Sequence, residues 1–204
     1  MTMPNYSTQP TTQPSLAAAA KNNIALWNQY YSMGNSAHKQ QKFAKATTYF
    51  ERCIGLCNKL SQQDLPKEKP LANKTLPNML YQASHNLAAC NNAMGRGLSA
   101  KDILTKLHDQ FIHIVSCPKH NRSIRLDVLA YIDQSLFSLT SQLAYLNQVD
   151  EIHSIIIKTE NIVTAVSKHL LSDTSQTIQA MPNNPDQLWG NKAETTLASA
   201  HTSF

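Results

Sequence analysis

The side chains best suited to chemistry in this sequence are its cysteines and histidines. Cys53 and Cys57 are four residues apart, which places both thiols on one face of a helix. Cys117 and His120 form a second pair with the spacing C-x-x-H. A structural zinc site needs four such ligands in a tetrahedral arrangement. Because Cys53 has the spacing of a buried apolar residue, we predict a core cysteine there, and neither a metal nor a cofactor.

Catalytic signatures are missing from the sequence. It has no G-x-S-x-G elbow, no glycine-rich phosphate loop and no H-E-x-x-H helix. The 13 acidic residues are scattered and the eight histidines are spread along the chain, so we interpret His108 and His113 as surface or edge residues. The sequence predicts a protein that is not an enzyme, and a catalytic site of unrecognised type is the weakest alternative.

Composition narrows the fold class. The chain has 204 residues, is 42% hydrophobic, and contains only five glycines, too few for the many tight turns of a β-sandwich or barrel. The nine prolines cluster at the start, in one middle linker, at one corner and in the tail. The long proline-free stretches between them are typical of helices, because proline breaks helix interiors. We therefore predict an all-α protein.

Targeting signals are not recognisable either. No uninterrupted apolar run approaches the roughly 18 residues of a membrane span. The start of the sequence, MTMPNYSTQPTTQPS, has neither the basic region nor the apolar core of a secretory signal. Four cysteines in a chain of this length are not typical of a disulfide scaffold. We expect a cytoplasmic protein without a membrane partner.

Apolar residues spaced three and four apart predict six helices. They cover residues 16–40, 43–60, 77–94, 99–116 and 123–146, and the sixth follows a break at residues 147–148 and reaches Leu170. Ser99 and Ser123 are the expected N-caps of the fourth and fifth helices. We predict a disordered segment over residues 1–15, a helical domain over 16–171 and a mostly flexible tail over 172–204.

The first predicted hairpin, residues 27–60, carries a repeat pattern. Its aromatic, large apolar and small residues follow the spacing of a tetratricopeptide repeat, which this segment resembles. The matching residues are Tyr30, Met33, Gly34, Ala37, Phe43, Ala46, Phe50 and Cys53. Small Gly34 and Ala46 would let the paired helices approach, and Phe43 and Phe50 would then fill the groove to the next pair. Two later hairpins match less closely.

The resemblance implies a stack of antiparallel helical hairpins, a tetratricopeptide-like α-α superhelix, with a binding face lined by the first helix of each pair. The partner-binding residues that it implies are Tyr31, Asn35, His38, Lys39, His85, Asn92, Phe137 and Tyr145, with Gln82, Ala89, Gln134 and Ser141 on the same face. Relatives that grip a C-terminal carboxylate use several basic residues beside an asparagine. Asn35 fits that pattern but the basic set is missing, which argues against such a role.

Charge is distributed unevenly along the chain. Residues 1–126 hold 15 Lys and Arg against 5 Asp and Glu, a net charge of +10, whereas residues 127–204 hold 3 against 8, a net charge of −5. This asymmetry indicates an acidic partner, self-association of unlike ends, or an ordinary solvated surface of uneven sign. The lysines are dispersed and no helix has a dense basic face, which argues against nucleic-acid binding.

Taken together, these patterns favour a non-enzymatic protein-interaction module that binds a peptide or a helix. It would be an adaptor or a small chaperone, as small bacterial proteins with about three such hairpins often are. The alternative is a regulatory protein that binds a signal peptide or nucleic acid through the basic N-terminal half. A homodimer is a further expectation, because Ile155, Ile156 and Ile157 are more apolar surface than one helix face can bury.

Overall fold

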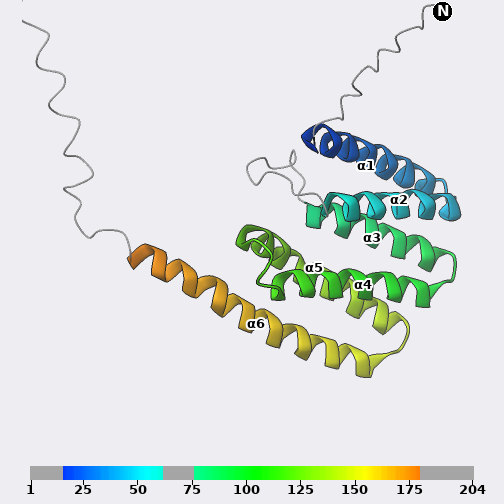
Figure 1. Cartoon of the computed structure of the whole chain (residues 1–204). Helices are drawn as coiled ribbons and strands as arrows, with labels where there is room; N and C mark the ends of the chain where they lie inside the picture. The colour runs from blue at the N-terminus through cyan, green and yellow to red at the C-terminus, as the bar shows by residue number, and fades with distance from the viewer. Residues whose placement is uncertain (1–15, 62–75, 180–204) are drawn as a thin grey trace, which may run out of the picture. The chain divides into compact units, whose positions relative to one another are not determined.

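A computed structural model describes residues 16–61 and 76–179 of the chain, and these residues form six α-helices and no strand (Figure 1). The helices are α1 (Leu16–Lys39), α2 (Phe43–Ser61), α3 (Leu76–Ala93), α4 (Gly97–Ser116), α5 (Arg122–Tyr145) and α6 (Val149–Gln179). Consecutive helices pack against each other from α1 to α5, and α3 also contacts α5. The predicted all-α fold of stacked helical hairpins is confirmed. No helix in the described ranges is long and apolar enough to cross a membrane.

The helix boundaries differ from the predicted ones mainly at the caps. Ser99 lies inside α4, whose N-cap is Arg96 and lacks a side-chain cap, and α5 is capped by Asn121. The Asn121 Oδ1 atom accepts a hydrogen bond of 3.0 Å from the Ser123 backbone N–H, so Ser123 is the capped residue and not the cap. Both predicted N-caps are wrong: α4 begins two residues before Ser99, and at α5 Asn121 supplies the cap.

The end of the last helix also differs from the expectation. Helix α6 continues to Gln179, past the predicted boundary at residue 171, since extending an existing helix needs no new nucleus. The chain divides after Val163 into two compact units, the second of which begins at Thr164. The segments 1–15 and 180–204, predicted to be disordered or flexible, lie outside the described residues.

The three hairpins close with the same turn. Gln41, Gly95 and Asn147 each have a positive φ, of 58°, 73° and 58°. In each turn the backbone N–H of this residue donates to the carbonyl three residues earlier. The N–H of the next residue donates to the carbonyl five residues before it, and the two bonds together form a Schellman motif. The following helix begins two residues after the left-handed residue in every case. Three different residue types therefore produce one turn geometry.

These turns set a common register for the stack. Gly34, Ala88 and Thr140 lie seven residues before the left-handed residue of their turns, whereas Ala46 and Ala100 lie five residues after it. Gly34 shows why a small residue is needed there, because a Cβ atom on it would lie 2.7 Å from Cε1 of Phe50. The buried ring of Phe50 thus packs directly on the backbone of α1.

The junction between the first and second hairpins is apolar and filled. Its buried residues come from three helices: Ala37, Ala46, Phe50, Leu87 and Cys90. The prediction that Gly34 and Ala46 are buried and that Phe50 connects two hairpins is confirmed. Met33, expected at a core position of the repeat, is instead exposed on α1.

The junction between the second and third hairpins has a second cluster. Ala88, Ala100, Leu104, Leu139 and Leu143 are buried there, and Ile152 and Ile155 of α6 pack against them. These residues join α3, α4, α5 and the first part of α6 around one core. Packing of this kind, rather than intrinsic propensity, supplies most of the stability of helices in proteins.

A buried histidine lies in the same region. His108 of α4 is 1% exposed, and its Nδ1 and Nε2 atoms are each 2.9 Å from a hydroxyl, of Ser135 and Thr159 respectively. The Ser135 hydroxyl donates to the Ile132 carbonyl, so it accepts from Nδ1–H, and the Thr159 hydroxyl donates to Nε2. The predicted surface position of His108 is wrong, since a neutral imidazole with both nitrogens paired can be buried.

Candidate functional site

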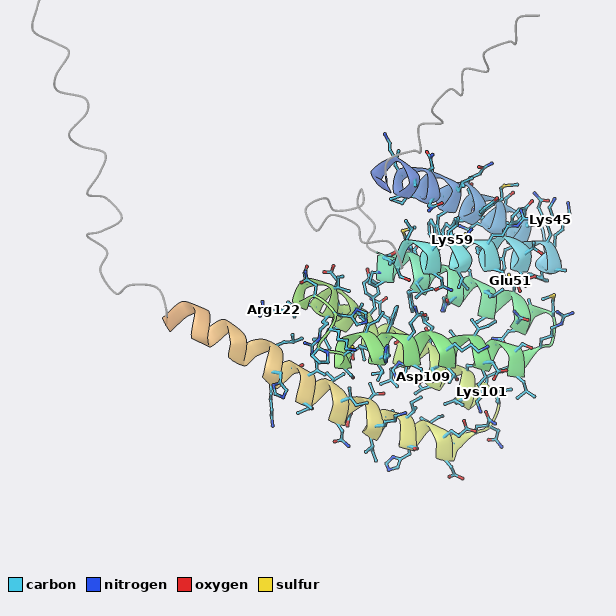
Figure 2. All side chains as sticks on the ribbon, viewed as in Figure 1. Lys45, Glu51, Lys59, Lys101, Asp109 and Arg122 are labelled. Carbon is cyan, nitrogen blue, oxygen red and sulfur yellow. The ribbon has the colours of Figure 1, made fainter. Side chains whose placement is uncertain are left out.

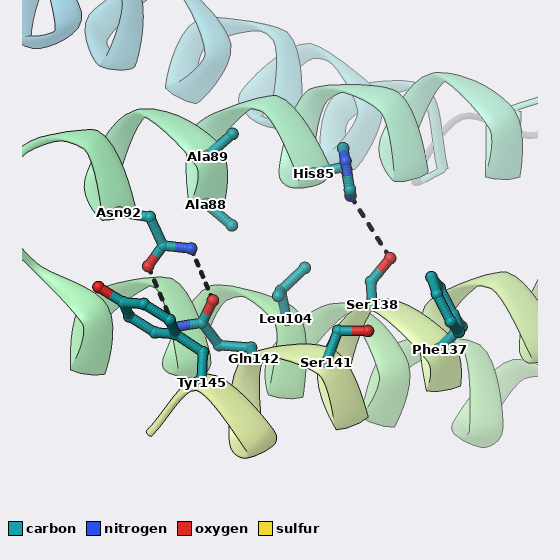
Figure 3. Close-up of a pocket in the computed structure, with 10 residues that line it drawn as sticks. All are labelled: His85, Ala88, Ala89, Asn92, Leu104, Phe137, Ser138, Ser141, Gln142 and Tyr145. Atoms are coloured by element: carbon teal, nitrogen blue, oxygen red, sulfur yellow. Dashed lines mark hydrogen bonds between the residues drawn. The ribbon is translucent and has the colours of Figure 1, made fainter. Parts of the chain in front are cut away.

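The candidate site is a groove between α3 and α5, the first helices of the second and third hairpins (Figure 3). It has a volume of about 310 Å³ and is open to solvent along one side. The residues that line it come mainly from these two helices: His85, Ala88, Ala89, Asn92, Leu104, Phe137, Ser138, Ser141, Gln142 and Tyr145. Figure 3 shows His85 opposite Phe137 at one end, and Asn92 opposite Gln142 and Tyr145 at the other.

The groove is lined by no Lys, Arg, Asp or Glu side chain. Helix α3 contains no Lys, Arg, Asp or Glu, and α5 contains none from Gln134 to its end at Tyr145. The charged residues of the hairpins lie mostly on the second helices, as for Lys101, which forms an ion pair with Glu151 at 2.6 Å. The sequence thus separates a neutral face on α3 and α5 from charged surfaces on α2, α4 and α6.

Amides hold one end of the groove closed. The Asn92 Nδ2 atom donates to Gln142 Oε1 at 2.6 Å, and Gln142 Nε2 donates back to Asn92 Oδ1 at 3.1 Å. The same Gln142 amide donates to the Gly97 carbonyl at 3.0 Å. Because these polar groups satisfy one another, the amides fix the distance between the helices.

Hydroxyl and ring contacts hold the other end. The Ser138 hydroxyl lies 3.2 Å from the Tyr81 hydroxyl and 3.4 Å from His85 Nδ1. Further along, Asn78 Nδ2 donates to the Tyr131 hydroxyl at 2.8 Å. The two walls are therefore connected by side-chain hydrogen bonds along their length, which makes the groove a preformed feature.

Two exposed aromatic residues stand at the rim of the groove. Phe137 is 73% exposed and Tyr145 is 70% exposed, the two highest values among the large hydrophobic residues that are described. Ala88, Ala89 and Leu104 form the apolar floor between them. Large apolar groups left in water beside a concave surface are typical of interaction sites.

Tyr145 also borders a second hollow. This hollow, of about 390 Å³, is formed by the turn between α3 and α4 and by Leu146. Leu98, 66% exposed, lies on its edge. Tyr145 therefore extends the exposed apolar surface from the groove to the end of the hairpins.

The structure brings together half of the predicted partner-binding residues. His85, Asn92, Phe137 and Tyr145 all line the groove. Ala89 and Ser141, placed on the same face by the sequence, line it as well. Sequence analysis missed Ala88, Leu104, Ser138 and Gln142 as lining residues.

The other half belongs to the first hairpin and lies outside the groove lining. Tyr31 and Asn35 both accept hydrogen bonds from Asn86 Nδ2, at 3.2 and 3.1 Å. The Tyr31 ring also stacks on Trp27 with centroids 4.7 Å apart. These contacts connect α1 to α3, and the assignment of Tyr31 and Asn35 as partner-binding residues stays a prediction.

The two remaining predicted residues lie at the end of α1. The His38 ring packs edge-on against Phe43, with centroids 5.4 Å apart. Lys39 is exposed to solvent. Neither residue lines the groove, which is formed by residues of α3, α4 and α5.

The cysteines show the chemistry of core residues. Cys53 is buried and its thiol donates to the Trp27 carbonyl at 3.6 Å. Burial raises the pKa of both Cys53 and Cys57 to about 12, so both thiols stay protonated at neutral pH. Among the described residues, no three His, Cys, Asp or Glu side chains converge as metal ligands would.

The comparison with protein families gives one match. A model described as "Protein of unknown function (DUF2753)" matches residues 25–172, most of the chain. The chain belongs to this family. The DUF2753 range contains every residue that lines the groove, whereas residues 1–24 and 173–204 lie outside it. The comparisons with curated proteins and with solved structures find no match.

Proposed function

We propose that this DUF2753 protein is a non-enzymatic protein-interaction module, an adaptor or a small chaperone, that binds a peptide segment in the groove between α3 and α5. The observation that supports this most is the pair of exposed aromatic residues, Phe137 and Tyr145, beside a preformed groove with an apolar floor. Burying two such rings is a large favourable term, since aromatic residues dominate the energetics of interfaces.

The resemblance to tetratricopeptide repeats is part of this proposal. The three equal turns, and the shared register of Gly34 with Ala88 and of Ala46 with Ala100, support it, because repeats of one supersecondary unit share such positions. In that family the first helices line the binding face, and here α3 and α5 line the groove. The resemblance is weaker in the third hairpin, where Thr140 and Ile152 replace small residues.

The test uses the full chain as bait for a displayed library of random dodecapeptides. We expect peptides to be enriched on the wild-type chain and to lose about tenfold or more in affinity on the double variant Phe137→Ala, Tyr145→Ala, as truncated hot spots do. Ile124→Ala is the matched control, because Ile124 is an exposed apolar residue of α5 that does not line the groove. Enrichment that is equal on all three proteins, or absent from all, would contradict the proposal.

A second candidate function rests on the surface of α2. Lys45, Arg52 and Lys59 are exposed and spaced seven residues apart, and Lys45 and Lys59 lie toward opposite ends of the helix (Figure 2). Arg52 also lies over the Tyr30 ring, 5.3 Å from its centroid. Such a row is the kind of surface that an anionic partner, including nucleic acid, can contact.

Fluorescence anisotropy with labelled RNA and DNA tests this alternative. Salt-sensitive binding that is lost in Lys45→Glu, Lys59→Glu and retained in the Phe137→Ala, Tyr145→Ala variant would favour it over the peptide-binding module. No binding at low salt would exclude it.

Compartment and oligomeric state remain proposals. We infer a reducing, cytoplasmic setting from the four free cysteines. The dimer expected at Ile155–Ile157 would have little apolar surface to bury. Ile155 packs against the buried cluster of the second junction, and of the three isoleucines only Ile157 is exposed. Light scattering of the wild type against Ile157→Lys measures whether that surface joins two copies.

A further inference from the structure

We propose that the occupant of the groove is an uncharged, extended segment of a partner protein, anchored by one aromatic or branched aliphatic side chain. This inference rests on the proposed peptide-binding function and names the chemistry of its partner. It differs from the acidic partner that the net charge of the N-terminal half suggests, because that charge does not lie in the groove.

The first argument is electrostatic. None of the residues lining the groove is Lys, Arg, Asp or Glu, so a charged side chain entering it would lose water and meet no permanently charged partner; among the lining residues only His85, beside the Ser138 hydroxyl, can take up a proton. The amides at the closed end offer little compensation, since Asn92 and Gln142 are bonded to each other and Gln142 also to Gly97. A partner segment that carried charges would have to keep them outside the groove.

The second argument is size. Phe137 and Tyr145 are eight residues apart on α5, a distance of about 12 Å along the helix axis. An extended chain advances about 3.3 Å per residue, so about four residues span the distance between the rings. Over that length a partner helix about 10 Å wide would occupy roughly 1,000 Å³ and an extended segment roughly 600 Å³, so the open groove of about 310 Å³ takes up a larger part of an extended segment than of a helix.

The third argument concerns the anchor. The floor is made of small or aliphatic side chains, Ala88, Ala89 and Leu104, which leave space but offer no polar partner. The exposed faces of Phe137 and Tyr145 stand on either side of that space. A ring or a branched aliphatic side chain inserted between them would bury apolar surface on three sides and stack against an aromatic face.

The experiment sequences the peptide pools enriched on the full chain. We expect the wild-type pool to be depleted of Asp, Glu, Lys and Arg over about four consecutive positions and to carry an aromatic or branched aliphatic residue among them. Ser141→Lys places a cation at the exposed rim and should shift the pool toward acidic peptides. Ser154→Lys, at an exposed serine of α6 outside the groove, should leave the pool unchanged.

Synthetic peptides from the wild-type pool supply the second measurement. Replacing one central uncharged residue by Asp should weaken binding by about tenfold, a loss that Ser141→Lys should partly recover. Affinity for the uncharged peptide should change less than about twofold between 0.05 and 0.5 M NaCl, because no ion pair is formed.

The outcomes separate the two proposals. A wild-type pool rich in acidic residues, or one with a helical pattern of anchors, would overturn this inference and leave the peptide-binding function standing. A pool that does not depend on Phe137 and Tyr145 would overturn both. Enriched peptides that match sequences within this chain itself would identify self-recognition instead of a partner protein, and would also overturn the inference.

Discussion

The two junctions of the stack have the same register but opposite character. Phe50 lies nine residues after the left-handed residue of its turn and fills the first junction, whereas Leu104 lies at the equivalent position and forms the floor of an open groove. Within their own hairpins Tyr31, His85 and Phe137 are equivalent, each ten residues before its turn, although Tyr31 precedes the first junction and Phe137 follows the second. Tyr31 is held between Trp27 and Phe50, but Phe137 is 73% exposed.

Two side chains account for most of this difference. Leucine is smaller than the phenylalanine ring at the equivalent position, which leaves space between α3 and α5. In the third hairpin, the position equivalent to Trp27 is Asp133, which is exposed, so Phe137 lacks the ring on which Tyr31 stacks. An open groove can thus take the place of a closed junction through side-chain volume alone, with the same turn geometry on both sides.

The largest effect is expected from emptying the filled junction. Phe50→Ala should destabilise the chain by about 4 kcal/mol, since it removes a fully buried ring and leaves a cavity on Gly34. Thr48→Ala is the control, because Thr48 is an exposed residue of the same helix. Urea unfolding followed by circular dichroism measures both, and a loss below about 1 kcal/mol for Phe50→Ala would contradict the account of this junction.

Filling the open second junction should make it resemble the filled first junction. Leu104→Phe should abolish peptide binding and destabilise the chain by about 2 kcal/mol, because Ala88 carries a methyl group where Gly34 carries none. Adding Ala88→Gly should remove part of that cost, with a coupling energy of about 1 kcal/mol in a double-mutant cycle. Additive effects would show that the two junctions are not equivalent.

Acid should weaken only the second junction. Burial lowers the pKa of His108 below 6.5, with Asp109 acting to raise it and Lys158 to lower it further. Below pH 6.5 the unfolded chain binds the proton more readily, so stability falls as pH falls toward the folded pKa, by at most about 1.4 kcal/mol per pH unit. In the first hairpin the position equivalent to His108 is Ile54, which cannot bind a proton.

Unfolding at several pH values checks this, with His108→Gln as the comparison. The wild type should lose more stability than the variant between pH 7 and the lower range. If the variant fails to fold, NMR titration of the His108 ring replaces it, and a pKa at or above 6.5 would contradict the prediction.

A smaller effect is expected at the helix contact itself. Gly34→Ala should destabilise the chain by about 1 kcal/mol, since the added Cβ meets the buried Phe50 ring at 2.7 Å and this outweighs the gain in helix propensity. Gly55→Ala is the matched control on α2, where a Cβ meets nothing within 4 Å. Thermal unfolding should show opposite shifts for the two variants, and shifts of one sign would contradict the close contact.

The smallest effect concerns the turns. Gln41→Gly should stabilise the chain by about 0.5–1 kcal/mol, because Gln41 has a φ of 58° that glycine adopts without strain. Gly95→Ala should have the opposite effect, since its φ is 73°. Melting temperatures of the two variants measure the effect at the turns of the first and second hairpins. A higher melting temperature for Gly95→Ala would contradict the left-handed conformation of this residue.

The fold was largely predictable from the sequence because its signals are local. The three-and-four spacing of apolar residues and the turn residues near positions 41, 95 and 147 lie within single hairpins. The buried state of His108 was not predictable, because its partners Ser135 and Thr159 come from helices far along the chain.

The site was half predictable for the same reason. Register alone places Phe137 and Tyr145 on the face of α5 that lines the groove. It places Tyr31 and Asn35 on the corresponding face of α1, but their bonds to Asn86 depend on a side chain of α3 that the register does not reveal. Position on a face is a local property, whereas accessibility depends on what the neighbouring layer supplies.

The recurrence of one Schellman motif at three loops has a consequence for how such a chain could have grown. Each turn ends one helix and begins the next at the same offset. Duplication of a segment that runs from one turn to the equivalent turn would therefore insert a whole hairpin and leave the junction geometry unchanged. The architecture can lengthen or shorten in steps of one hairpin, and each added layer brings a fresh inter-layer space that side-chain size alone can open or close.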